Sequence, residues 1–85
     1  MAAANDLEEI SNYLNAHHAA LARETIQRIY GAAISLKHFP EKGRPAKAAG
    51  VRELVLAPLP YLIVYSIEAE SVHVFRILHG ARDRV

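Results

Sequence analysis

The chain changes character at residues 39–45, and this change limits the folds open to it. The segment Phe-Pro-Glu-Lys-Gly-Arg-Pro contains two prolines and a glycine, which favour a loop over a helix or a strand. Apolar residues before the loop recur at helical spacing, whereas those after it form short runs typical of strands. A chain of 85 residues has room for one domain. The sequence therefore predicts a single α+β domain over residues 1–85, with helices first and strands second.

Two helices are expected before the loop. The first is predicted to begin at Asn5, because Asn caps helices and Glu8 stands three residues on, as in a capping box. The pair His17-His18 is predicted to end or bend it. The second helix is predicted from about Ala19 to Leu36, on an apolar stripe of Ala22, Ile26, Ile29, Ala33 and Leu36. The short connection predicts an antiparallel helical hairpin.

Three strands are expected after the loop, at Val51–Ala57, Tyr61–Ile67 and Val72–Leu78. Close spacing makes them an antiparallel meander. The middle run is apolar on both faces and is therefore predicted to be the central strand. The expected order is α-α-β-β-β, with the helical hairpin packed on one face of the sheet.

Several classes of site are excluded or not indicated by the residues. The chain has no cysteine, so disulfides and thiolate metal sites are excluded. His17, His18 and His38 do not form a metal constellation, since adjacent histidines on a helix point about 100° apart. Neither a glycine-rich phosphate loop nor a nucleophile elbow is present. We therefore expect no metal and no cofactor.

The longest apolar stretch, Leu54 to Ile67, is interrupted by Pro58, Pro60 and Ser66 and is too short to cross a bilayer. The start of the chain lacks the basic and apolar segments of a signal peptide. We therefore expect a cytoplasmic protein without a membrane partner.

Charge is distributed unevenly along the chain. The net charge is only +1 with histidine neutral, which is weak for a protein that binds nucleic acid by neutralising phosphates. The charged residues among 1–24 are four acids and the single base Arg23, whereas residues 44–84 carry six cations on which a basic face can form: Arg44, Lys47, Arg52, Arg76, Arg82 and Arg84.

The order of these fragments resembles the ParE/RelE superfamily of toxins, which includes plasmid stabilisation proteins. The resemblance lies in Asp-Leu-Glu-Glu-Ile (residues 6–10), the second helix, the 39–45 loop, Val-Arg-Glu-Leu (51–54), Tyr-Leu-Ile-Val-Tyr (61–65) and Arg-Ile-Leu-His-Gly-Ala-Arg-Asp (76–83). It covers nearly the whole chain, and the ending His-x-x-Arg-Asp is closer to the ParE branch. It implies the toxin of a type II toxin–antitoxin module that arrests growth and is neutralised by a cognate antitoxin.

One departure from the family pattern concerns the start of the chain. Members of this family usually carry a strand before the first helix, whereas this sequence opens at the helix itself. Loss of that strand would remove a sheet partner and bare an edge. The expected consequences are a domain that still binds its antitoxin, a homodimer formed through the bare edge, or an inactive protein.

Arg76 and His79 lie in the last predicted strand, and Arg82 follows it. If the strand stays regular, Arg76 shares a face with Val72, Val74 and Leu78. Arg76 then either reaches solvent or pairs with a carboxylate such as Glu53. In RNase members of the superfamily such side chains assist attack by the 2′-hydroxyl of RNA, so the resemblance implies a catalytic role for Arg76, His79 and Arg82 if the chain is a nuclease. A hydrogen-bonded structural histidine is the simpler interpretation of His79.

Arg44, Arg52 and Arg84 are candidates for binding a target or its phosphates, because a guanidinium holds phosphate bidentately. The simpler interpretations are a loop residue bonded to backbone carbonyls for Arg44, a solvated strand edge for Arg52 and a solvated tail for Arg84. Tyr61 and Tyr65 are interpreted as core residues with solvated hydroxyls.

Three functions from different classes remain at this stage. The first is a ParE-like toxin that binds and inhibits DNA gyrase, which the low charge and the His-x-x-Arg-Asp ending favour. The second is a RelE-like enzyme, a metal-independent endoribonuclease that cuts mRNA on the ribosome. The third is a truncated, non-toxic interaction module.

Overall fold

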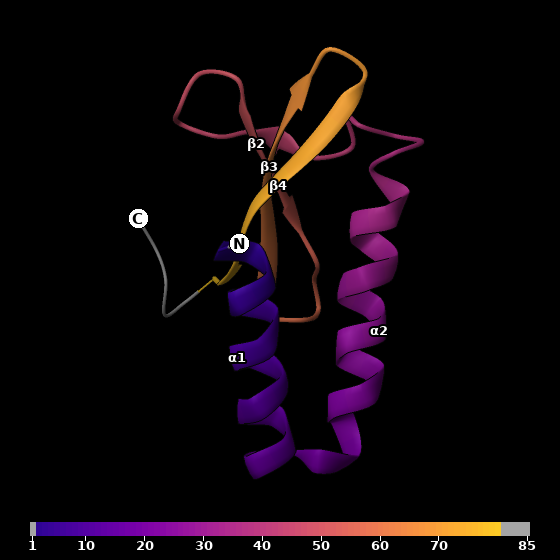
Figure 1. Cartoon of the computed structure of the whole chain (residues 1–85), viewed down its shortest axis with the longest axis vertical. Coiled ribbons are helices and arrows are strands. Elements are labelled where there is room, and N and C mark those ends of the chain that lie inside the picture. Colours follow the sequence, from indigo (N-terminus) through magenta and orange to yellow (C-terminus); the bar gives the residue numbers. More distant parts are fainter. Residues whose placement is uncertain (1, 81–85) are drawn as a thin grey trace.

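The computed structural model describes residues 2–80 and contains two helices and four strands. The helices are α1 (Ala2–His17) and α2 (Ala19–Ser35), and the strands are β1 (Arg44–Pro45), β2 (Val51–Val55), β3 (Tyr61–Glu68) and β4 (Ser71–His79). Figure 1 shows the helices running side by side as a hairpin, with the sheet against the end of the hairpin away from its turn. The predicted α+β class, the hairpin and the three long strands are confirmed.

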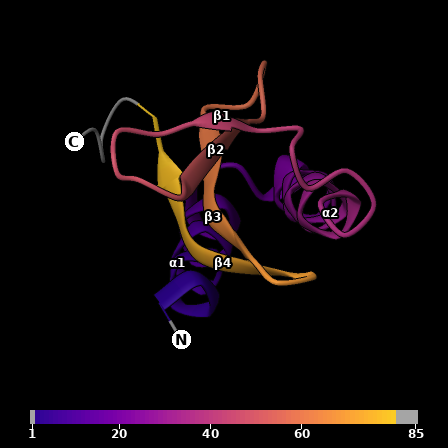
Figure 2. The same ribbon diagram turned by 90° about the horizontal axis from the view of Figure 1, so that it is seen from above.

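All neighbouring strands are antiparallel, in the order β1-β2-β3-β4, so β4 lies at one edge. The two-residue strand β1 pairs with β2 inside the segment predicted to be loop, placing Arg44 opposite Glu53. The central position predicted for residues 61–67 is confirmed, because β3 pairs with both long neighbours. Figure 2 shows the sheet from above, with α1 and α2 beside it.

The predicted start of the first helix was wrong, because α1 begins at Ala2 and not at Asn5. Ala2, Ala3 and Ala4 have the highest intrinsic helix propensity of any residue type, which lengthens the helix at its N-terminal end. Asp6 therefore lies inside the helix, where it is 7% exposed. The predicted break at His17-His18 is confirmed, since His18 has the non-helical angles φ −146° and ψ 55° and separates the helices.

The core lies between the hairpin and one face of the sheet. From the helices it receives Ile10, Leu14, Ala22, Ile29 and Leu36, and from the sheet Leu54, Tyr61, Ile63, Tyr65 and Ile77. The register places Leu54 and Ile77 on either side of Ile63, so these sheet residues share a face. Both helices therefore cover the same face, as the sequence predicted.

A β-bulge interrupts the pairing of β3 with β4. Val64 lies opposite Arg76, but the next residue of β3, Tyr65, lies opposite Val74, which leaves Phe75 as the extra residue. Side chains of β4 therefore change faces at this point. Val72 and Val74 share the helix-covered face with Ile77 and His79, whereas Arg76 does not, so the regular alternation expected for this strand was wrong.

Candidate functional site

The face of the sheet turned away from the helices carries apolar side chains together with charged ones, since the register places Glu53 and Arg76 on either side of Val64. Leu62 and Val64 of β3 point to this face. The residues of β2 and β4 that pair with them point to the same face. The apolar members of this surface, here called the open face, are Val51, Val55, Leu62, Val64 and Leu78. Val55 is 45% exposed and the others are half-buried. Within residues 2–80 both helices pack on the opposite side, so no helix covers these side chains.

Arg44 lies beside the open face and is neutralised by a neighbour. Its Nε donates to Oε1 of Glu53 over 3.1 Å, and the guanidinium remains largely exposed. Exposed pairs of this kind stabilise a fold by about 0–1 kcal/mol. Glu53 therefore forms its ion pair with Arg44, and the pairing of Glu53 with Arg76 that the sequence suggested was wrong.

Arg52 points to the helix-covered side and holds the loop before β1. Its Nη1 donates to the carbonyl oxygen of Gly43 over 2.6 Å, and Nη2 lies 4.0 Å from Oε1 of Glu41. The side chain is partly buried. Arg52 thus acts as a clamp on residues 41–43, and its use as a phosphate ligand stays a prediction.

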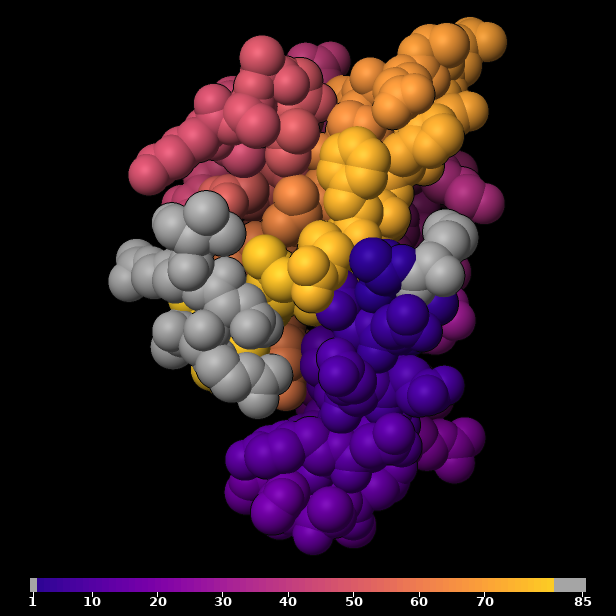
Figure 3. Space-filling view, turned by 60° about the vertical axis from the view of Figure 1, so that its left-hand side comes forward, coloured from indigo at the N-terminus to yellow at the C-terminus, as the bar shows by residue number. Residues whose placement is uncertain are grey.

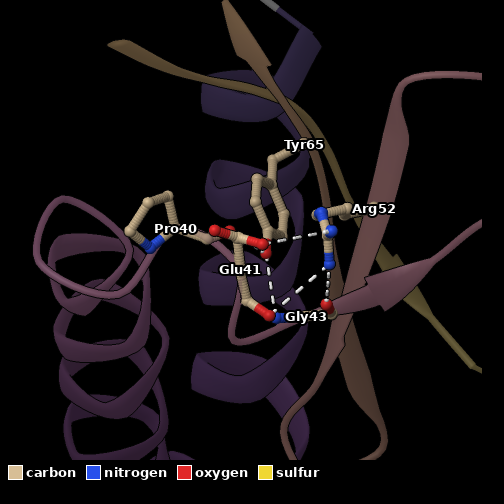
Figure 4. A network of polar contacts seen from close by, with 5 residues as sticks. All are labelled: Pro40, Glu41, Gly43, Arg52 and Tyr65. Carbon is tan, nitrogen blue, oxygen red and sulfur yellow. Dashed lines mark hydrogen bonds and ion pairs between the residues drawn. The ribbon is translucent and has the colours of Figure 1, made fainter. Parts of the chain in front are cut away.

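The same loop is held by Tyr65, whose hydroxyl lies inside the protein and not in solvent as predicted (Figure 4). The hydroxyl donates to the carbonyl oxygen of Pro40 over 2.7 Å and accepts from the N–H of Gly43 over 2.9 Å. A Cβ at Gly43 would lie 2.6 Å from the Tyr65 hydroxyl, so a side chain has no room there. Sequence reasoning missed this anchor, because nothing in the spacing joins Tyr65 to the Pro-x-x-Gly segment.

Arg76 is bound to α1 at the other edge of the sheet. Its Nε and Nη2 donate to Oδ2 and Oδ1 of Asp6 over 2.7 and 2.9 Å, and the backbone N–H of Ile77 donates to the same carboxylate over 2.9 Å. Figure 3 shows the first turns of α1 lying against β4. The carboxylate thus occupies a hydrogen-bonding position of the edge strand that a further strand would otherwise use.

The environment of Asp6 favours its charged form. Burial by itself raises the pKa of the carboxyl group. The hydrogen bonds from Arg76 and from the Ile77 N–H, together with the guanidinium charge, outweigh burial and hold the pKa of Asp6 below its ordinary value of 3.8. Asp6 is therefore ionised at neutral pH and links α1 to β4.

His79 lies opposite Tyr61, with their rings edge to face and 5.6 Å apart. It borders two adjoining hollows of about 320 Å³ each between the hairpin and the sheet. One of them is also lined by Asp6, Glu9, Tyr13 and Arg76. The structure therefore brings His79 and Arg76 to one hollow, with a carboxylate and a phenol beside them.

The predicted cations are not gathered in a single cluster. Arg44 and Arg52 lie on β1 and β2, whereas Arg76 and His79 lie on β4 at the opposite edge. Arg82 and Arg84 lie outside the described residues. In the part of the chain that the structure describes, no three His, Cys, Asp or Glu side chains are grouped as a metal site requires. Among residues 2–80, neither helix is long and apolar enough to cross a membrane.

Comparison with known proteins supplies the family. Residues 1–84 match the family model described as the ParE toxin of the type II toxin–antitoxin system parDE. The chain belongs to the ParE toxin family. The resemblance to the ParE/RelE superfamily predicted from the sequence is thereby confirmed, and the chain is a toxin of a type II toxin–antitoxin system, which implies an antitoxin partner.

Individual members of the ParE/RelE superfamily agree with this assignment. Toxin RelE2 of Caulobacter vibrioides is 42% identical over 77 residues, covering 91% of this chain and 85% of its own length. Y4kP of Sinorhizobium fredii is 35% identical over 74 residues, covering 87% and 76%. A chain from the chromosomal ParDE system of P. aeruginosa superposes with a TM-score of 0.83 at 25% identity, over 92% of this chain and 87% of its own.

Proposed function

We propose that this ParE-family toxin arrests growth by binding and inhibiting DNA gyrase in the cytoplasm, with the open face as its binding surface. The observation that carries the proposal is the row of apolar side chains Val55, Leu62 and Leu78 on the open face, which neither helix covers. Apolar residues at the centre with charged residues at the rim are the usual anatomy of a protein–protein interface. Arg44 and Glu53 supply such a rim on one side.

The arrangement of the cations also favours binding over RNA cleavage. A nuclease needs an acid–base pair and cations converging on one phosphate. Among residues 2–80, Arg44 and Arg52 lie far from the Arg76 edge of the sheet, and Asp6 engages two nitrogens of Arg76. A toxin that acts by binding has no such requirement.

A supercoiling assay with purified gyrase tests the proposal. The wild-type toxin is expected to inhibit supercoiling, and Val55→Asp is expected to weaken inhibition at least tenfold, because it places a charge on the open face. The matched control is Ile67→Asp, which introduces the same charge at an exposed position on the other face of the sheet. Equal inhibition by both variants and the wild type would remove the open face from the proposal.

Ribosome-dependent mRNA cleavage is the second candidate, favoured by the hollow that Glu9, Tyr13, Arg76 and His79 share. It predicts codon-positioned cuts in mRNA by the wild-type toxin, lost in His79→Ala with the fold intact. Such cuts, with gyrase unaffected, would replace the gyrase proposal by the nuclease.

A further inference from the structure

A stripe of exposed residues runs along the outer side of α2 and into the turn after it. Arg23, Gln27, Tyr30, Ile34 and Lys37 follow one another at steps of three or four residues, so they share one helical face. The backbone N–H of Lys37 bonds to the carbonyl oxygen of Ile34, which continues the helical path to this residue. We call these five residues the α2 stripe.

The centre of the α2 stripe is apolar and uncovered. Tyr30 is 56% exposed and Ile34 is 53% exposed, one turn apart. Gly31 lies next to them, and a Cβ added there would meet nothing within 4 Å. Glycine weakens a helix interior relative to alanine, and no packing within residues 2–80 requires it at this position. A glycine beside two exposed apolar side chains allows another backbone to approach closely.

The two ends of the α2 stripe are positive. Arg23 stands at one end and Lys37 at the other, with His38 beside it. Within residues 2–80 neither Arg23 nor Lys37 forms an ion pair, whereas the nearby Arg28 is paired with Glu24. From Arg23 to Lys37 a helical path spans roughly 20 Å at about 1.5 Å per residue. A binding partner that complements the α2 stripe would therefore present an apolar segment with a carboxylate near each end.

We propose that the α2 stripe is a docking surface for an amphipathic helix of the antitoxin, with apolar residues at its centre and acidic residues near both ends. Amphipathic helices recognise such surfaces through anchors one turn apart. The inference rests on the antitoxin partnership that family membership implies, and not on the choice between gyrase and mRNA. Because α2 packs on the other face of the sheet from Leu62 and Val64, the α2 stripe and the open face are separate surfaces.

Two other occupants fit the α2 stripe less well. A second copy packed through the same stripe would bring Arg23 against Lys37 in an antiparallel pair, or each cation against itself in a parallel pair. Like charges would then repel at both ends. Nucleic acid binding depends on several phosphate contacts, whereas the α2 stripe offers only two permanent cations, one at each end of its apolar centre.

Calorimetric titration of the toxin with its cognate antitoxin tests the inference. Tyr30→Ser/Ile34→Ser is expected to weaken the affinity at least tenfold. Arg23→Glu/Lys37→Glu is expected to weaken it to a similar extent and to reduce its dependence on salt. The matched controls are Leu21→Ser, at an exposed position on another side of α2, and Lys42→Glu/Lys47→Glu, which makes the same charge change elsewhere. Both controls are expected to bind within twofold of the wild type.

Gly31→Gln separates docking from folding. Glutamine is a better helix former than glycine, so the free toxin is expected to melt at a higher temperature while its affinity for the antitoxin falls at least tenfold. Unchanged affinity in all three stripe variants overturns the inference. Two other results would overturn the inference, provided that the stripe variants keep their affinity for the antitoxin. If the wild type is a dimer that Tyr30→Ser/Ile34→Ser dissociates, the occupant is a second copy of the chain. If the wild type binds single-stranded RNA and only the stripe variants lose that binding, the occupant is nucleic acid.

Growth arrest without antitoxin distinguishes this inference from the proposed function. The stripe variants are expected to remain as toxic as the wild type, because the target is assigned to the open face. Stripe variants that lose toxicity but keep antitoxin affinity would assign the stripe to the target. If the wild type fails to inhibit gyrase, the proposed function fails, while the titration still decides the inference.

Discussion

Replacing Asp6 by Asn is expected to destabilise the fold measurably. Asn has nearly the same shape, but one carboxylate oxygen becomes an NH2 group. With its oxygen in the place of Oδ2, Asn can still accept from the Ile77 N–H and from Arg76 Nε, but its NH2 then faces Nη2 of Arg76, which is also a donor. The variant therefore loses at least one charge-assisted hydrogen bond between α1 and β4.

The magnitude follows from the exposure of the two partners. A hydrogen bond to a charged group contributes about 1.5–3 kcal/mol when it is protected from water. The Asp6 side chain is 8% exposed, but that of Arg76 is 50% exposed, so solvent weakens their attraction. We expect a loss of about 2 kcal/mol in the free energy of unfolding, which is a shift of about 2 M in the urea midpoint for a slope of about 1 kcal/mol/M.

The pH dependence of this loss has a definite sign. Because the folded-state pKa of Asp6 is lowered, the stabilisation is complete above the unfolded-state value near 3.8 and disappears as pH falls through the folded-state value. Urea unfolding at pH 7 should therefore separate wild type from Asp6→Asn, and the difference in unfolding free energy should begin to shrink only as the pH falls below about 4. Glu9→Gln, an exposed substitution on the same helix, is the control and should stay within about 0.5 kcal/mol of the wild type. A difference that persists unchanged to pH 2.5, or no difference at pH 7, would refute the reasoning.

The loop anchor and the exposed pair give three further predictions. Tyr65→Phe leaves the Gly43 N–H and the Pro40 carbonyl oxygen without their side-chain partner; we expect a loss of about 1–2 kcal/mol in thermal unfolding and faster hydrogen exchange at residues 41–43. Gly43→Ala forces a Cβ to within 2.8 Å of the Glu53 carbonyl oxygen as well as against Tyr65; a loss of about 1–3 kcal/mol in urea unfolding is expected, and a neutral effect would contradict the close packing. Arg44→Ala removes only an exposed ion pair, so chemical denaturation should show a change below about 1 kcal/mol, decreasing further in high salt.

Local pattern predicted the elements of this fold well, because each is determined by residues near it in the chain. The apolar residues from Ala22 to Leu36 line up on one face only in a helix, and the apolar run 61–67 is accommodated between two neighbouring strands. The start of α1 was misplaced because two local signals competed at Asn5. The capping pattern favoured a start there, but three alanines before it favoured continued helix, and Asp6 was engaged elsewhere.

The candidate site was harder to predict because its contacts join distant parts of the chain. Asp6 lies 70 residues from Arg76, and Tyr65 lies 22 residues from Gly43. The spacing of apolar residues along the chain does not indicate which distant residues will form such pairs. The extra residue at Phe75 had a larger consequence, since a bulge reverses the face of every residue after it. Only the pairing register shows that Arg76 and Val74 point to opposite faces.

The placement of the two proposed surfaces constrains how an antitoxin could neutralise this toxin. A helix docked on the α2 stripe lies behind the hairpin, on the far side of the sheet from Val55 and Val64, and leaves the open face uncovered. Docking on the α2 stripe alone would therefore supply affinity without blocking the target. Neutralisation then requires a second segment of the antitoxin to reach around the sheet, and the short strand β1 and the edge of β4 beyond Asp6 are the two routes by which an extended segment could do so. The Asp6 carboxylate already occupies the Ile77 N–H on the β4 route, which leaves the β1 edge as the less obstructed path.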